Sequence, residues 1–167
     1  MNKLLTTIII LITCLGCNAE NDLSTADQEQ ALPGVVLDRC IPDSEFFVGG
    51  INYRSTKKDV ISIKGKPDNI TNYEFERIET FEYGDMSVEF INDQVLYLST
   101  SSPKNGTPSG VVCGMSREEA MKTLGIKIYD KKASEMHFIN CSYEVSMIFK
   151  FDENNSISTI EMGNDPT

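Results

Sequence analysis

The sequence contains no tryptophan and one histidine, and its 15 lysine and arginine residues are outnumbered by 25 aspartate and glutamate residues. The formal charge of −10 leaves no basic surface to neutralise phosphates, so nucleic acid is not expected as a partner. The lack of tryptophan argues against a sugar-stacking groove. With 167 residues, 40% of them hydrophobic, the chain has the size and composition of one globular domain.

The sequence also lacks a hydrophobic run long enough to cross a membrane. The longest run extends only from Leu4 to Gly16, whereas a spanning helix needs about 20 residues. It follows Lys3, so residues 1–16 are predicted to be a signal peptide. Gly16 followed by Cys17 resembles the lipobox of bacterial lipoproteins, in which the cysteine receives a diacylglyceryl group and the chain is cut just before it.

The lipobox resemblance implies a location. Cys14 stands where the family usually has leucine and is the alternative modified residue, but it would put Thr13 at the cleavage position. Asn18 follows the cysteine in place of aspartate, which by resemblance favours the outer membrane, facing the periplasm. We therefore expect an envelope lipoprotein anchored through Cys17, with palmitate among its acyl chains.

Residues 17–33 are predicted to form a flexible tether between the lipid and the folded domain. Asn18 to Pro33 contains four acids and no base, and Leu23 and Leu32 are its only large apolar residues. Such a segment cannot bury enough apolar surface to offset the entropy of ordering it. A short helix over residues 25–32 is the alternative.

The cysteine pattern lacks a CxxC pair, and His137 is the only histidine, so neither a metal site nor a cofactor is expected. Three cysteines, Cys40, Cys113 and Cys141, remain in an oxidising compartment. We expect a disulfide between Cys113 and Cys141, since both fall in the second half of the chain. Cys40 would then be buried or paired with a partner.

Residues 56–65 align without a gap on residues 116–125, which indicates a duplication. Each segment begins with a capping box and ends at a glycine: Thr56 with Asp59 and Gly65, and Ser116 with Glu119 and Gly125. Two short helices are therefore predicted. Neither is long enough to be stable alone, so each must pack against the strands after it in the chain.

Alternating apolar residues come after each predicted helix, over residues 73–98 and 136–162. The first series reads as strands at 73–83, 86–90 and 95–98, with a turn at Asn92 and Asp93. The predicted fold class is α+β: two tandem repeats, residues 34–104 and 105–167, each a short helix packed on a three-stranded antiparallel meander. Together they would form one compact unit.

Parts of the first repeat resemble the SmpA/OmlA-type repeat: Thr56 to Ile61, Gly65 to Asp68, Phe81 to Tyr83 and Val88 to Val95. That repeat occurs in the small lipoprotein of the outer-membrane barrel-assembly machine and, by structural likeness, in tandem in β-lactamase inhibitor protein. Known members of this group bind proteins rather than catalyse reactions. The matching positions are structural, so the resemblance assigns no functional residue here.

No catalytic residue is predicted, and the protein is not expected to be an enzyme. His137 lies in a strand-like run, and no glycine-flanked serine suggests a nucleophile. Paired carboxylates are available on the polar side of the strands, but nothing there would raise their pKa.

An acidic stripe is instead the candidate for protein binding, and its leading residues are Glu74, Glu76, Glu82 and Glu89. It is either a solvated face that discourages edge-to-edge pairing, or a docking face for a basic enzyme or effector. Residues 116–132 are net positive, and this contrast could orient the partner.

Three functions are compatible with these features. The first is an inhibitor or immunity protein that blocks a toxic or envelope-degrading enzyme, and it is the one we favour. The others are an accessory scaffold in outer-membrane assembly and a lipoprotein that binds the cell wall or a small ligand.

Overall fold

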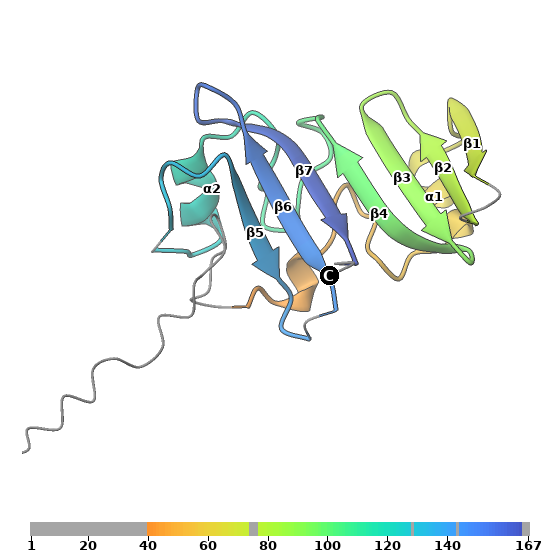
Figure 1. The fold of residues 1–167 in the computed structure, drawn as a ribbon, viewed down its shortest axis with the longest axis horizontal. Coiled ribbons are helices and arrows are strands. Elements are labelled where there is room, and N and C mark those ends of the chain that lie inside the picture. The colour runs from red at the N-terminus through yellow and green to blue at the C-terminus, as the bar shows by residue number, and fades with distance from the viewer. Residues whose placement is uncertain (1–39, 74–76, 128, 143, 165–167) are drawn as a thin grey trace, which may run out of the picture. The chain divides into compact units, whose positions relative to one another are not determined.

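The computed structural model describes residues 40–73, 77–127, 129–142 and 144–164. These residues build one antiparallel sheet of seven strands in the order β1-β2-β3-β4-β7-β6-β5 (Figure 1). The strands are β1 (Asn69–Tyr73), β2 (Ile78–Glu82), β3 (Met86–Ile91), β4 (Gln94–Thr100), β5 (Glu135–Ile139), β6 (Ser146–Phe151) and β7 (Ile157–Gly163). The helical elements are η1 (Asp43–Glu45), α1 (Lys57–Lys64) and α2 (Arg117–Thr123).

The prediction of two tandem repeats, each with its own three-stranded meander, is wrong. All seven strands belong to a single sheet, in which β4 pairs with β7 from Tyr97 opposite Gly163 to Thr100 opposite Ile160. Most strands bury apolar side chains on the same face, so joining the two halves extends one core instead of building two. Sequence alternation within each half contains no information about this pairing.

The run from Tyr73 to Tyr83, predicted as one strand, instead contains the last residue of β1 and the whole of β2. Arg77 directly precedes β2 and has a left-handed backbone conformation, with φ of 57°. Because the chain reverses there, Tyr73 and Phe81 differ in burial although they share a parity in the sequence. Phe81 is buried, whereas Tyr73 is 53% exposed.

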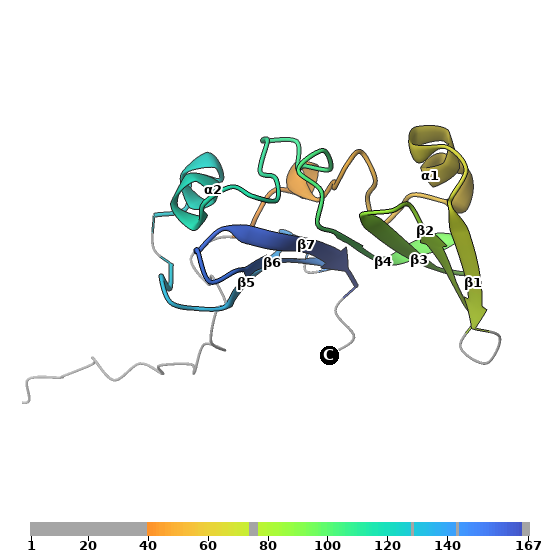
Figure 2. The same ribbon diagram turned by 90° about the horizontal axis from the view of Figure 1, so that it is seen from above.

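Both predicted helix starts are confirmed. Thr56 Oγ1 accepts a hydrogen bond from the Asp59 N–H at 3.2 Å, and Ser116 Oγ accepts one from the Glu119 N–H at 3.3 Å. In both boxes the acidic side chain also accepts from the N-cap backbone. Figure 2 shows α1 and α2 on the same side of the sheet. No helix in the described part of the chain is both long and apolar enough to span a membrane.

The core lies between this helical layer and the sheet. Burial alternates along β3, where Met86, Val88 and Phe90 point inward. The Phe81 and Phe90 rings pack with centroids 4.7 Å apart, and a corresponding pair, Phe138 and Phe149, packs at 4.8 Å on the other side of the sheet's centre. One continuous cluster of buried side chains therefore runs under both halves.

The disulfide joins Cys40 to Cys141, so the predicted Cys113–Cys141 bridge is wrong. Ile41 forms a parallel bridge with Asn140, in which its N–H donates to the Ile139 carbonyl at 3.0 Å, and this pairing brings Cys40 beside Cys141. Cys113 is a buried free thiol that donates to the Thr100 carbonyl at 3.3 Å. Its position in the core keeps it away from both other cysteines.

Removing the disulfide should destabilise the fold strongly. The bridge closes a loop with a sequence separation of 101, and loss of such a link typically lowers the free energy of unfolding by about 2 to 5 kcal/mol. We expect Cys40→Ser/Cys141→Ser to show this loss in urea unfolding and to become insensitive to reductant. Cys113→Ala should remain reductant-sensitive; insensitivity of Cys113→Ala would instead support the original pairing.

Candidate functional site

The sheet face opposite the helices, here called the outer face, is built from two rows of paired residues. The first row crosses all seven strands through Asn69, Glu82, Ser87, Ser99, Glu161, Ile148 and His137. The second crosses them through Thr71, Thr80, Glu89, Tyr97, Gly163, Ser146 and Ile139. No helix of the described ranges lies over this face (Figure 2).

Tyr97 is the large side chain near the middle of the outer face, on β4 where the two halves of the sheet meet. Its cross-strand neighbour on β7 is Gly163. A Cβ at Gly163 would lie 3.0 Å from Tyr97 Cδ2 and 3.0 Å from the Leu96 carbonyl oxygen. Glycine therefore lets the tyrosine ring approach the β7 backbone closely.

Tyr97, Glu161 and Lys150 form a hydrogen-bonded group, here called the central cluster. The Tyr97 hydroxyl bonds to Glu161, and Lys150 Nζ lies 2.6 Å from Glu161 Oε1. The Glu161 side chain is only 12% exposed. Burial is the main cause that raises the pKa of Tyr97 well above its ordinary value of 10.0, and the charges of Glu161 and Glu89 raise it further.

The outer face is acidic. In the two rows its charged or titratable side chains are three carboxylates, Glu82, Glu89 and Glu161, and His137. Glu135 and Lys150, which pair across β5 and β6, lie on the same face just beyond the first row. Of the four residues predicted to bind a partner, the structure brings Glu82 and Glu89 together on this face. Glu74 and Glu76 lie outside the described residues.

The sequence interpretation missed the central cluster. Glu79, which lies between Glu76 and Glu82 in the acidic stretch of sequence, points to the helical side of the sheet and forms an ion pair with Lys57 of α1. Tyr97, Lys150 and Glu161 come from three different strands of the two halves. The β6–β7 pairing brings Lys150 beside Glu161, and the β4–β7 register adds Tyr97, so no local pattern could have identified the whole cluster.

Not all of the bases behind the predicted charge contrast between the two halves are on the surface. Arg117, counted among the bases of residues 116–132, is 4% exposed. Its guanidinium stacks 3.8 Å from the Phe151 ring centroid and donates to the Asp130 and Ala133 carbonyls, so it holds the chain together and is not available to a partner. Exposed lysines remain on the helices, including Lys58 and Lys122, opposite the acidic outer face.

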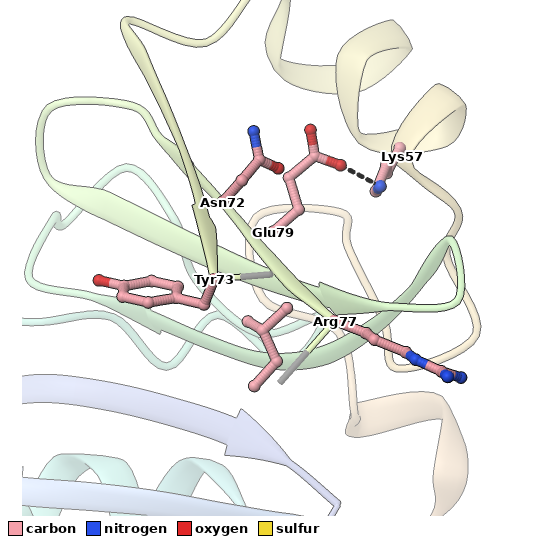
Figure 3. Close-up of a pocket in the computed structure, with 6 residues that line it drawn as sticks. Lys57, Asn72, Tyr73, Arg77 and Glu79 are labelled. Carbon is pink, nitrogen blue, oxygen red and sulfur yellow. Dashed lines mark ion pairs between the residues drawn. The ribbon is translucent and has the colours of Figure 1, made fainter. Parts of the chain in front are cut away.

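A hollow of about 320 Å³ lies at the β1 edge of the sheet, beside α1. Asn72 and Glu79 extend from neighbouring strands on the side of Lys57, whereas Tyr73 and Arg77 point away (Figure 3). Glu79 is already paired with Lys57, and the six lining residues include no serine, cysteine or histidine nucleophile. The interactions in this hollow fix α1 onto the sheet.

His137 lies on β5, the strand at the other end of the sheet. Its Nε2 is 2.9 Å from Glu135 Oε1, two residues earlier on the same strand. This contact is a local pair on the outer face. The predicted lipidation residue, Cys17, lies outside the described residues.

The comparisons with known proteins concern the fold. No family model and no curated protein matches the sequence. Among solved structures, a cysteine-rich secretory protein from Staphylococcus aureus matches with TM-score 0.51 and 9% identity, over 66% of this chain and 43% of that one. An extracellular protein containing an SCP domain from Bacillus anthracis matches with TM-score 0.42 and 9% identity, over 84% and 50%.

A DUF4309 family protein from Bacillus subtilis matches with TM-score 0.40 and 14% identity, over 66% of this chain and 79% of that chain. The chain spans 43% of the staphylococcal protein and 50% of the Bacillus anthracis protein. At 9% identity the likeness to the staphylococcal protein shows a shared fold alone, and the two matches with lower TM-scores carry no argument. The resemblance to SmpA/OmlA-type repeats stays a prediction.

The central cluster should make the protein sensitive to alkali. Because the pKa of Tyr97 is raised on folding, its stabilising contribution is complete below about pH 10 and is lost as pH rises further. At pH 11 the unfolded state gains at most about 1.4 kcal/mol from releasing this proton while the folded state keeps it, and solvent screening of the half-buried ring lowers that figure. Urea unfolding at pH 9 and 11 should therefore show a smaller fall for Tyr97→Phe than for the wild type. Exposed Tyr73→Phe should behave like the wild type, and an unchanged fall in Tyr97→Phe would contradict the assignment.

Proposed function

We propose that this protein is an exported, lipid-anchored binding module whose outer face holds a basic surface of a protein partner, and that it acts as an inhibitor or immunity protein against a toxic or envelope-degrading enzyme. One observation carries the proposal. The described helices all lie on one side of the sheet, and the other side presents Glu82, Glu89 and Glu161 on the strands near the central Tyr97.

The chemistry of the outer face favours arginine or lysine on the partner. Glu89 lies directly across from Tyr97, so a guanidinium could meet a carboxylate and an aromatic ring at one point. Glu82 lies in the adjacent row and accepts a hydrogen bond from Ser87 Oγ at 3.1 Å, which orients its carboxylate. Complementary charge accelerates association and disfavours acidic competitors.

The shape of the outer face favours a protein over a small ligand. Small residues lie next to Tyr97, namely Ser87 and Ser99 in the adjacent row and Gly163 directly across from it, and they allow the backbone of a partner to approach the sheet. A half-buried tyrosine among such residues has the character of an interface hot spot. The described hollows lie elsewhere, beside the two helices.

Three features support an oxidising, extracytoplasmic location. The sequence has a signal-like start ending at Gly16 and Cys17. A disulfide joins Cys40 to Cys141, as is usual in exported proteins. The solved structure from Staphylococcus aureus, similar in fold, is a secretory protein by its name.

The inhibitor role rests on the binding chemistry together with the resemblance to repeats whose known members bind proteins. A lipid-anchored acidic face would intercept a basic enzyme at the membrane before it reaches its substrate. The scaffold alternative requires the same face to bind components of outer-membrane assembly. The identity of the captured protein therefore distinguishes the two roles.

Reversing the charge of the outer face should weaken binding. We expect Glu82→Lys/Glu89→Lys to lower affinity for a basic enzyme partner about tenfold or more, because two attractive contacts become repulsive. The full-length protein, immobilised, would capture its partner from envelope extracts, and surface plasmon resonance would then compare affinities. Glu118→Lys/Glu153→Lys, with the same charge change at exposed sites outside the outer-face rows, is the control.

Addition of the wild-type protein should also reduce the activity of the captured enzyme. Capture of barrel-assembly components instead of an enzyme would overturn the inhibitor role in favour of the scaffold. Equal affinities for wild type and Glu82→Lys/Glu89→Lys would show that the acidic stripe is a solvated face that does not bind the partner.

Lipidation can be tested separately. Labelled palmitate supplied to bacteria that express the full chain should be incorporated into the wild type and into Cys14→Ser. Cys17→Ser should lose the label, because the acyl chains attach to the cysteine that becomes the first residue after cleavage. Loss of label in Cys14→Ser alone would move the anchor to Cys14.

A further inference from the structure

The two edge strands of the sheet, β5 and β1, differ in how they are protected from pairing with another chain. At the β5 edge, Ile41 pairs with the residues just after β5, and the Cys40–Cys141 disulfide secures this pairing. The same strand carries charged or titratable Glu135 and His137. Covering segments and charges of this kind prevent an edge strand from pairing with another chain.

The β1 edge has none of this protection. Its sequence, Asn69–Tyr73, contains no charged residue and no proline. Within the described part of the chain, β2 is the one strand paired with β1. All but one of its residues are exposed, so its free edge is open to a further strand.

The hydrogen bonds of the neighbouring strands show which residues of β1 direct their backbone N–H and C=O groups to the open edge. Tyr83 and Met86 exchange both N–H···O bonds across the β2–β3 hairpin, so the odd-numbered residues of β2 direct their backbone groups to β3. Thr80 consequently directs its groups to β1, where it pairs with Thr71. Ile70 and Asn72 are left with their N–H and C=O groups at the open edge.

Two exposed apolar side chains lie on this same edge strand, Ile70 toward the helical side and Tyr73 toward the outer face. Among the described residues, the large hydrophobic side chains classed as exposed all come from α1 or β1: Ile61 (43%), Ile63 (47%), Ile70 (46%) and Tyr73 (53%). Exposed apolar side chains on a strand with a free edge favour contact with another chain.

The charge of this region is compatible with a second copy of the chain as the occupant. Residues 56–79 carry equal numbers of bases and acids, in a chain whose formal charge is −10. The bases are Lys57, Lys58, Lys64, Lys66 and Arg77, and the acids are Asp59, Asp68, Glu74, Glu76 and Glu79. This neutral segment allows two copies of an otherwise acidic protein to approach without strong repulsion.

We propose that the occupant is a second copy of this chain, which pairs its β1 strand antiparallel to the first across a two-fold axis at Thr71. This register pairs the whole of β1 with itself and sets Ile70 opposite Asn72 of the second copy. Those are the residues whose backbone groups face the open edge, so each such pair exchanges both of its N–H···O bonds. Inward-facing residues stay opposite inward-facing ones, and the two sheets and their outer faces become continuous.

Opposite charges at residue 71 test this register. Wild-type full-length protein, purified in detergent if membrane-bound, should sediment as a dimer at micromolar concentrations. Thr71→Lys and Thr71→Glu should each sediment as monomers, since like charges directly opposite each other repel. Their equimolar mixture should recover the dimer. His137→Lys, which adds the same charge to the other edge strand, should remain dimeric.

Cysteine cross-linking tests the same contact without depending on affinity. Directly opposite residues in a non-hydrogen-bonded pair have Cα atoms about 4.5 Å apart, which suits a disulfide. Thr71→Cys should therefore give a covalent dimer on non-reducing gels of intact cells. Asn72→Cys, whose side chain lies opposite Ile70, is the control and should give little.

A wild-type chain that stays monomeric up to about 100 µM, together with a Thr71→Cys variant that forms no covalent dimer, would overturn the proposal. So would a dimer that survives in both charged variants, since it would use another surface. A Thr71→Cys adduct to a different protein would instead show that β1 receives a foreign strand. None of these results bears on the outer-face variants, so the two proposals fail independently.

Discussion

The pairing of β4 with β7 holds the two halves of the protein in one sheet. It joins strands from the two halves of the chain, with Leu98 opposite Met162 on the core side. Without it, each half would be a small sheet with two free edges and a core too small to hold a short helix. With it, the apolar faces merge into one core, and Tyr97 comes to lie against Gly163 on the other side.

The same pairing separates the charges of the protein between two faces. Carboxylates from both halves gather on the outer face, where Glu161 accepts from Tyr97 and pairs with Lys150. The helices cover the opposite side, where Arg117 is buried against Phe151. Part of the overall charge of −10 is thus gathered on one surface, and this is why we propose a basic partner.

The Cys40–Cys141 disulfide has two structural roles. It closes a long loop, which limits the conformations of the unfolded chain, and it holds Ile41 over one end of the sheet. The opposite end, at β1, has no comparable cover among the described residues. A single sheet with one protected and one open edge is suited to extension in one direction only.

Neighbouring residues alone account for the local structure: both capping boxes, the Asn92 turn and the alternation that buries Val88 and Phe90 could all be predicted from the sequence. The acidic stripe that contains Glu82 could be located in the same way. The strand order, the disulfide partner of Cys141 and the central cluster were decided by tertiary structure, because each depends on residues far apart in the chain. Local patterns specify which face of a strand is apolar, but two apolar faces can be joined in several ways. Only packing in three dimensions selects one of them.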